Sequence, residues 1–124
     1  MTADGDTVAT EAQAFFLNHT QYFGKGMRAC PHALWDDGLF DMAWFSHKRR
    51  GAVLRIFGAI QTGAHDSLVE TRQAKQCVLE LPCQEGLFNL DGEVVRYVGG
   101  KITIECVPRA YRLLAPVQEH TALG

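Results

Sequence analysis

Short segments in which apolar and polar residues alternate dominate the second half of the chain, and this period of two is the signature of β-strands. They cover residues 77–81, 87–90, 94–98 and 101–106. Two pairs that are typical of tight turns, Asp91-Gly92 and Gly99-Gly100, separate the last three segments. Turns this short join antiparallel neighbours, because a parallel pair needs a crossover of a dozen residues or more. The pattern therefore favours an antiparallel sheet over a parallel α/β fold.

The first half adds two strand-like segments and a helix. Residues 11–18 and 39–45 are apolar and aromatic enough to form strands. After residue 46 the period changes, and apolar residues recur at the spacing of one helical face. These residues are Val53, Ile56, Phe57 and Ile60. Gly63 is expected to end the helix. The fold class predicted from these patterns is mainly β, with antiparallel strands and one amphipathic helix.

A length of 124 residues suits a single domain. Residues 1–10 carry no periodic pattern, so we expect a disordered leader there, followed by one domain over residues 11–116 and a loose tail over residues 117–124. Twelve basic and fourteen acidic residues give a net charge of −2, which excludes the broad basic surface of a nucleic-acid-binding protein. No apolar run is long enough to cross a membrane, and no signal peptide is recognisable, so a cytoplasmic location is expected.

The four cysteines, at positions 30, 77, 83 and 106, lack CxxC spacing and have no pair of histidines nearby. Zinc binding is therefore not expected. We expect reduced thiols, with most of these cysteines acting as small apolar residues in strands. His32 and His65 are expected to be ordinary loop or surface residues.

A first acidic corner lies at Asp36-Asp37-Gly38, with Asp41 close behind it. Adjacent carboxylates repel each other unless a cation compensates, and Mg²⁺ prefers carboxylate, carbonyl and water oxygens. The same residues are typical of a solvated turn, because Asp-Gly pairs are common there. On the residues alone, the solvated turn is the favoured interpretation.

A second acidic corner lies at Leu90-Asp91-Gly92-Glu93. A two-residue turn would pair Leu90 with Glu93 and place Glu93 on the apolar face of the hairpin. Burial there would raise the pKa of this carboxyl group toward neutrality, as a general base requires. In the alternative, Glu93 lies at the end of the sheet and reaches water.

The run His47-Lys48-Arg49-Arg50 precedes the predicted helix. Cations oppose the helix dipole at this end, unless an anionic lipid or a phosphate compensates them. The alternative is a solvated turn before a helix that begins near Gly51.

In order along the chain, three blocks resemble the C-terminal domain of the diacylglycerol kinase, sphingosine kinase and ceramide kinase family. The first block joins the strand that ends in Asn18 to the glycine-rich turn and Pro31. The second is Leu34-Trp-Asp-Asp-Gly-Leu-Phe-Asp41, and the third is Leu90-Asp-Gly-Glu93 with the strands after it. The resemblance covers residues 12–116. It implies a C-terminal antiparallel β-sandwich that closes a cleft over the lipid substrate.

In that family the γ-phosphate of ATP passes to a lipid hydroxyl, with Mg²⁺ as the cofactor. Carried over by position, the resemblance implies that Asp37 binds Mg²⁺ together with the backbone carbonyls of Leu34 and Leu39. It makes Glu93 the proton acceptor, with Asp91 supporting the same acidic network. The lipid would be a diacylglycerol or a long-chain base.

The family's Gly-Gly-Asp-Gly-Thr nucleotide motif, which lies in an N-terminal domain, is absent from this chain. We therefore expect ATP binding to require that separate nucleotide-binding domain, and the chain alone to be inactive. Two alternatives to a lipid kinase involve no catalysis. One is a non-catalytic module that binds lipid or protein, with residues 48–50 against an anionic membrane surface, and the other is a purely structural domain with a bound ion.

Overall fold

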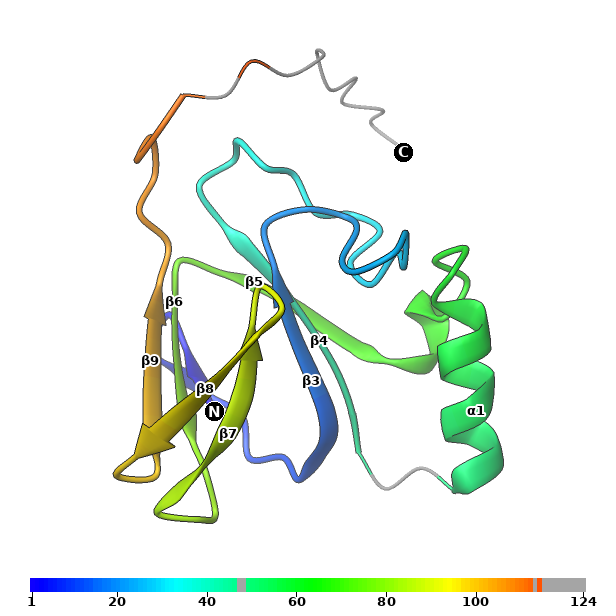
Figure 1. Cartoon of the computed structure of the whole chain (residues 1–124), viewed down its shortest axis with the longest axis horizontal. Coiled ribbons are helices and arrows are strands. Elements are labelled where there is room, and N and C mark those ends of the chain that lie inside the picture. The colour runs from blue at the N-terminus through cyan, green and yellow to red at the C-terminus, as the bar shows by residue number, and fades with distance from the viewer. Residues whose placement is uncertain (47–48, 113, 115–124) are drawn as a thin grey trace.

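A computed structural model describes residues 1–46, 49–112 and 114, and in these residues every paired strand runs antiparallel to its neighbour. The strands are β1 (Thr2–Ala3), β2 (Asp6–Thr7), β3 (Ala12–Asn18), β4 (Phe40–Ser46), β5 (Glu70–Ala74), β6 (Gln76–Glu80), β7 (Glu85–Leu90), β8 (Glu93–Val98) and β9 (Lys101–Glu105). The helices are α1 (Arg50–Ala59) and a single 3₁₀ turn, η1 (Asp66–Leu68). The predicted mainly β fold with one amphipathic helix is confirmed (Figure 1).

The central sheet has the order β3-β4-β5, and β4 is buried on both of its faces because it is the middle strand. On one face, Phe40, Met42 and Trp44 join the main apolar cluster, and the ring of Phe15 stacks on that of Trp44. On the other face, Ala43 packs in a second cluster with Ile60, which follows α1. Continuous burial explains why β4 is apolar at almost every position rather than at alternate positions.

Strand β5 lies in a stretch that the sequence pattern left irregular, and it continues into β6 after a bend at Lys75. This bend carries the chain from the central sheet into a second sheet of order β2-β1-β6-β9. The carboxylate of Asp4 accepts hydrogen bonds from the backbone N–H groups of Lys75 and Gln76, at 2.9 to 3.1 Å. These bonds hold the pKa of Asp4 below its ordinary value.

The expected disordered leader at residues 1–10 is wrong. Residues 1–8 form a small hairpin: β1 pairs with β6, and the side chain of Ala3 is fully buried in the main apolar cluster. The pattern was too short for detection, because each strand has two residues and the stabilising partners lie about 70 residues away in sequence.

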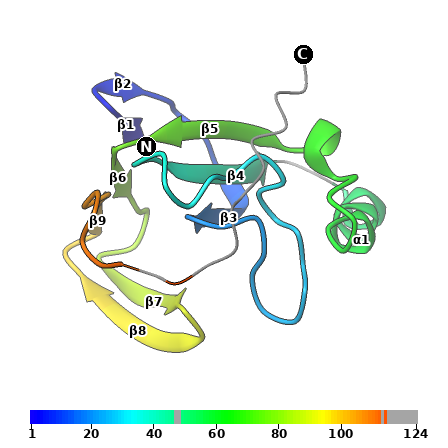
Figure 2. The same cartoon turned by 90° about the horizontal axis from the view of Figure 1, so that it is seen from above.

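Strands β7 and β8 form a separate two-stranded sheet, which lies apart from β5 beyond β3 when the molecule is seen from above (Figure 2). The predicted register is confirmed, because Leu90 pairs with Glu93 and Phe88 with Val95. Asp91 and Gly92 have φ values of 50° and 93°. Positive φ at both positions is what a type I′ turn requires.

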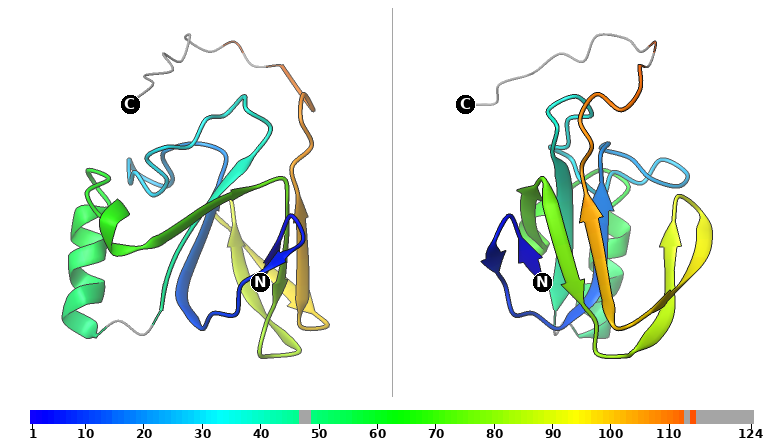
Figure 3. Two further views of the ribbon diagram at one scale, coloured as in Figure 1. Left: turned by 180° about the vertical axis from the view of Figure 1, so that it is seen from behind. Right: turned by 90° about the vertical axis from the view of Figure 1, so that its left-hand side faces the viewer.

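Helix α1 flanks the central sheet on the side opposite β6 and β9 (Figure 1). Its apolar face is the predicted one, since Ile56 and Ile60 are buried and Phe57 contacts Phe45 edge to face. The helix ends at Ala59, and the chain then turns through Gly63 at a φ of 79°. Beyond β9 the chain leaves the body of the domain as an extended segment (Figure 3). The predicted tail at residues 117–124 lies outside the described residues, as do His47 and Lys48 of the basic run.

Candidate functional site

The first acidic corner is a tight turn that leads into β4. Gly38 has a φ of 75°, a conformation that glycine adopts without strain. The Oδ1 atom of Asp37 accepts a hydrogen bond of 2.9 Å from the backbone N–H of Leu39, so this carboxylate closes the turn. Through its Oδ1 atom, Asp37 therefore forms the turn that the sequence pattern indicates. The other oxygen, Oδ2, is not used in closing the turn.

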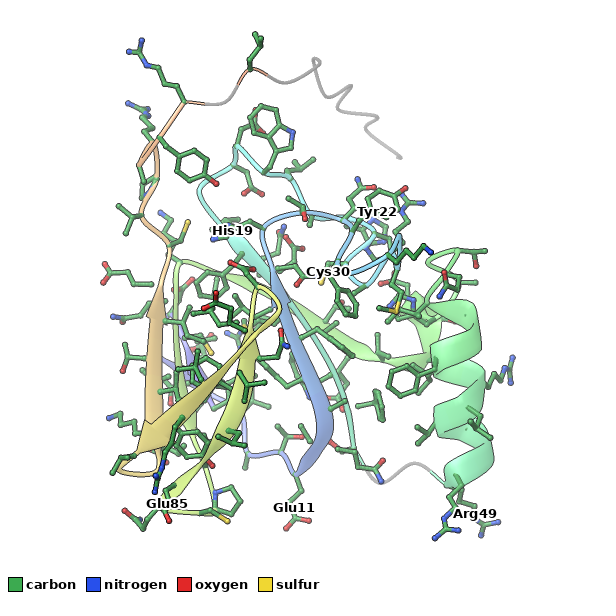
Figure 4. The ribbon with its side chains drawn as sticks, viewed as in Figure 1. Glu11, His19, Tyr22, Cys30, Arg49 and Glu85 are labelled. Carbon is green, nitrogen blue, oxygen red and sulfur yellow. The ribbon has the colours of Figure 1, made fainter. Side chains whose placement is uncertain are left out.

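A cleft of about 430 Å³ opens beside this turn. Residues of the loop before β4 line one wall, among them Cys30, His32, Leu34 and Asp37, and the beginning of β4, residues of β5 and Asp66 of η1 line the rest. Three carboxylates, those of Asp37, Asp41 and Asp66, therefore share one cleft. Figure 4 shows Cys30 and His19 near the beginning of β4, at the end of the molecule opposite Glu85.

Asp41 is the buried carboxylate of the cleft, with 8% of its surface exposed. Its position follows from the register, which places it opposite Gln73 of β5, and the Nε2 atom of Gln73 donates a long hydrogen bond of 3.4 Å to Oδ2. Burial raises the pKa of Asp41 above its ordinary value, and the nearby carboxylate of Asp37 adds to the rise. The sequence signal for Asp41 is an acidic residue inside an otherwise apolar strand, and the sequence alone gives this residue no role.

Two histidines attach the loop before β4 to η1. The Nε2 atom of His32 lies 3.0 Å from Oδ2 of Asp66, and the Nε2 atom of His65 lies 2.9 Å from the carbonyl oxygen of Ala29. His32 is exposed, as expected. His65 lies in a turn, so the expected loop position is correct, but its ring is almost completely buried rather than at the surface. Within the described part of the chain, Oδ1 of Asp66 is buried without a hydrogen-bond partner. No local pattern in the sequence indicated that Asp66 reaches this cleft.

The thiol of Cys30 also lines the cleft. Burial raises its pKa to about 12, and the negative charges of Asp41 and Asp66 contribute to the rise. Because the thiolate is the nucleophilic form, Cys30 is an inert, protonated residue at neutral pH. The structural role that we expected for this cysteine is consistent with its position.

The second acidic corner lies at the tip of the β7–β8 hairpin. The face of the hairpin that carries Glu93 is half-buried at Phe88 and Val95, one pair below the tip. Glu93 itself is exposed, so the expected burial of this carboxylate in the domain is wrong, and the alternative in which it reaches water is correct. Leu90, the partner of Glu93 in the last pair, is exposed as well.

The structure does not place the two acidic corners in one pocket, because neither Asp91 nor Glu93 lines the cleft that contains Asp37. The hairpin tip does point toward the end of the molecule that carries the loop at residues 34–38 (Figures 1 and 3). The corners therefore lie on separate elements that are directed toward the same end.

The predicted Mg²⁺ ligands are only partly assembled. Leu34 and Asp37 line the cleft together, but Leu39 does not, and its carbonyl oxygen lies 3.1 Å from Nδ1 of His19. Among the described residues, no group of three or more His, Cys, Asp or Glu side chains could hold a metal ion. The oxygen ligands that are present fit an ion that keeps most of its water, as Mg²⁺ does, rather than a closed cage of side chains.

An antiparallel, mainly β domain with an Asp-Asp-Gly turn over a cleft and an Asp-Gly-Glu hairpin belongs to the class of sandwich domains that the sequence resembles. The model of the "YegS C-terminal NAD kinase beta sandwich-like domain" matches residues 1–115. The chain therefore belongs to this family, and the match begins at the hairpin that we had expected to be a disordered leader.

Three relatives specify the family further. Human sphingosine kinase 2 is 34% identical over 102 residues, which are 78% of this chain and 15% of that protein. The diacylglycerol kinase of Mycobacterium tuberculosis is 30% identical over 100 residues, 81% of this chain and 32% of the relative. A probable YegS-like lipid kinase of Xanthomonas axonopodis is 33% identical over 106 residues, 83% of this chain and 33% of the relative.

The expected resemblance is thus confirmed, and the chain is a C-terminal domain of the lipid kinase family. It spans one third or less of the length of these curated relatives. None of the helices in the described residues is long and apolar enough to span a lipid bilayer.

Proposed function

We propose that this domain forms the lipid side of an ATP-dependent lipid kinase, which transfers the γ-phosphate of ATP to the hydroxyl group of a diacylglycerol or a long-chain base. The nucleotide would be held by a separate N-terminal domain. The observation that carries the proposal is the family match over residues 1–115, which includes both acidic corners. The names of the relatives, a sphingosine kinase and a diacylglycerol kinase, support lipid alcohols as the acceptor class.

In the proposed reaction, Glu93 accepts the proton of the lipid hydroxyl while the oxygen attacks the γ-phosphorus. The new O–P bond forms as the bond to the β-phosphate oxygen breaks, so the products are a lipid phosphate, ADP and a proton on Glu93. Asp91, two residues away in the same turn, would belong to the same acidic network as Glu93. The hairpin geometry fixes the spacing of these two acids, because the turn leaves no free loop between the strands.

Asp37 would contribute its Oδ2 atom to Mg²⁺, together with the carbonyl of Leu34. The carbonyl oxygen of Leu39 already contacts Nδ1 of His19. To bind Mg²⁺ as well, it would have to keep this contact with its other lone pair or give it up. When bound, the ion would supply positive charge near the phosphates. Asp37 also closes the turn through Oδ1, so the ligand oxygen is held on a rigid corner rather than on a free side chain.

A kinase that contains this domain tests the role of Glu93. We expect Glu93→Gln to lower kcat by about 10²- to 10⁴-fold, the usual contribution of a positioned general base. Glu105→Gln removes another exposed carboxylate, on β9, and should leave kcat unchanged. Turnover of the Glu93→Gln enzyme close to that of the wild type would remove Glu93 from the mechanism.

The metal role of Asp37 has its own matched control in the neighbouring Asp36, which is also exposed and does not line the cleft. We expect Asp37→Asn to raise the Mg²⁺ concentration needed for half-maximal activity, and Asp36→Asn to leave it unchanged. A titration in which both variants match the wild type would mean that Asp37 serves only the turn.

The alternative function, a non-catalytic module on an anionic lipid surface, has one favourable observation. Arg49 and Arg50 are exposed at the N-terminal end of α1, and Leu54 is exposed one turn further on. Sedimentation with vesicles that contain anionic lipid separates the two functions. Binding that Arg49→Glu and Arg50→Glu abolish, without phosphorylation in the presence of a nucleotide-binding domain, would favour the module.

A further inference from the structure

Helix α1 lies at one side of the molecule, and a strip of its surface is open to solvent (Figures 1 and 2). Ile56 and Ile60 face the domain and are buried. The opposite strip consists of exposed residues three or four positions apart, which are neighbours on a helix. They are Arg50, Gly51, Leu54, Arg55 and Gly58. We call these five residues the outer face of α1.

The charge of the segment around α1 is opposite to that of the rest of the chain. No acidic residue occurs between Asp41 and Asp66, whereas four of the twelve basic residues lie there. This segment therefore carries a charge of +4, and the remainder of the chain carries −6, since the net charge is −2. Among the residues that the structure describes, no carboxylate forms an ion pair with Arg49, Arg50 or Arg55. These three cations are available to an external anion.

Two features of the helix are not explained by the packing of the domain. Arg49 occupies the N-cap position without a side-chain hydrogen bond, and the first turn has no acidic residue, although cations are unfavourable at this end of a helix. Gly51 and Gly58 weaken the helix relative to alanine, but a Cβ atom at either position would meet no atom within 4 Å. An anionic surface would compensate the arginines. The two glycines leave the side chain of Leu54 uncovered between them.

The apolar part of this surface is small and lies between cations. Leu54 has 73% of its surface exposed, and Phe57, at the margin of the outer face, has 44% exposed. Arg50 lies one turn before Leu54, and Arg55 follows it directly. Leucine beside arginines is typical of a helix that lies in the interface of a bilayer, where the leucine enters the acyl boundary and the cations meet the headgroups. A protein partner would need a broader apolar centre than this.

We propose that the outer face of α1, together with Arg49, is the surface by which this domain contacts an anionic lipid bilayer. The inference rests on the proposed function, because a kinase of lipid alcohols meets its substrate in a bilayer. Figure 4 shows Arg49 at the end of the molecule opposite Cys30, which lines the acidic cleft. This cation is thus separated from the carboxylates that an anionic surface would repel. Three arginines and one leucine are too few for stable anchoring, so the contact is reversible.

Sedimentation with vesicles tests the surface directly. The chain is mixed with vesicles of phosphatidylcholine that contain about 30% phosphatidylserine, or with vesicles of phosphatidylcholine alone. We expect binding only to the anionic vesicles, and weaker binding as the salt concentration rises. Arg50→Gln combined with Arg55→Gln should weaken binding about 25-fold, since each cation near an anionic surface contributes about fivefold. Leu54→Ala should weaken it about tenfold.

Two control variants make the same changes elsewhere. Arg109→Gln combined with Arg112→Gln removes two exposed cations from the segment after β9, and Leu87→Ala shortens a leucine that is 69% exposed on β7. Neither control should change binding by more than about twofold, because charges far from the contact are screened by salt.

Three results would overturn the proposal. In the first, the two double arginine variants weaken binding equally, so that only the net charge of the chain matters. In the second, Leu54→Ala binds as tightly as the wild type, or vesicles without phosphatidylserine bind equally well. In the third, the chain binds polyglutamate but no vesicles, which would assign the face to an acidic protein.

Phosphorylation by a kinase that contains this domain separates the inference from the proposed function. In micelles of an uncharged detergent that carry the lipid substrate, Arg50→Gln combined with Arg55→Gln should leave turnover unchanged, because no anionic surface is present. On anionic vesicles, the same variant should need more lipid for half-maximal activity, with kcat unchanged.

Vesicle binding through the outer face of α1 without any lipid phosphorylation would retain the surface and count against the proposed function. Phosphorylation on anionic vesicles that is insensitive to the two arginines would retain the function and refute the surface.

Discussion

Phe40 precedes Asp41 in β4 and lies in the main apolar cluster, and its replacement by alanine gives a quantitative test of the fold. The ring is completely buried at the beginning of β4, in the main apolar cluster, and the ring of His19 contacts it edge to face at 6.1 Å. Burial of a Phe side chain contributes about 1.5–3 kcal/mol. The ring pair contributes about 0.5–1.5 kcal/mol. With the cavity that remains, Phe40→Ala should cost about 3–5 kcal/mol.

This loss is a large part of the roughly 5–15 kcal/mol by which a domain of this size is stable. In urea unfolding monitored by tryptophan fluorescence, a loss of 4 kcal/mol at a slope of about 2 kcal/mol per molar shifts the midpoint down by about 2 M. Leu54→Ala, at an exposed position of α1, should change the free energy of unfolding by less than about 0.5 kcal/mol. A cost below about 1 kcal/mol for Phe40→Ala would show that β4 is not the buried centre of the fold.

Two further perturbations follow from the same structure. Because burial raises the pKa of Asp41, the wild-type domain loses stability as the pH rises from the ordinary value of 3.8 through the raised folded-state pKa. Asp41→Asn should therefore be the more stable protein in urea unfolding at pH 7, with a difference that shrinks toward pH 4, and a constant difference at every pH would contradict this. Gly58→Ala in α1 should raise the free energy of unfolding by about 0.5–1 kcal/mol. Gly92→Ala, at a φ of 93°, should lower it by about 1–2 kcal/mol. If thermal unfolding shows that Gly58→Ala and Gly92→Ala change the stability in the same direction, the assignment of the turn at Gly92 is refuted.

The local chemistry of the turns was readable from the sequence, as the two acidic corners illustrate. Asp91-Gly92 determines a two-residue turn, and with it the pairing of Leu90 with Glu93. Asp37-Gly38 determines the corner before β4, because the carboxylate and the glycine each satisfy a local backbone requirement. These interactions join residues that are close in sequence, so the pattern contains the necessary information.

Burial could not be derived from the same patterns. Glu93 has the alternation of a buried position, but it is exposed because no other element in the described part of the chain buries the last pair of the hairpin, in which Leu90 is exposed too. His65 has the surroundings of a loop residue, but it is buried because η1 packs on the loop that contains Ala29. Each outcome depends on an element from a distant part of the chain, and its position is a property of the packed domain.

The sequence alone determined the antiparallel fold class, the single helix, the two acidic turns and the family resemblance, because these depend on spacing, turn residues and short motifs. The tertiary structure decided that Ala3, in the hairpin of the first eight residues, belongs to the core, that Asp41 and Asp66 share a cleft with Asp37, and that Leu87, Val94 and Val98 of the β7–β8 hairpin are exposed. The physical reason is that contacts between distant segments, and the water that they exclude, set burial and proximity, whereas local sequence sets only the conformation of each segment.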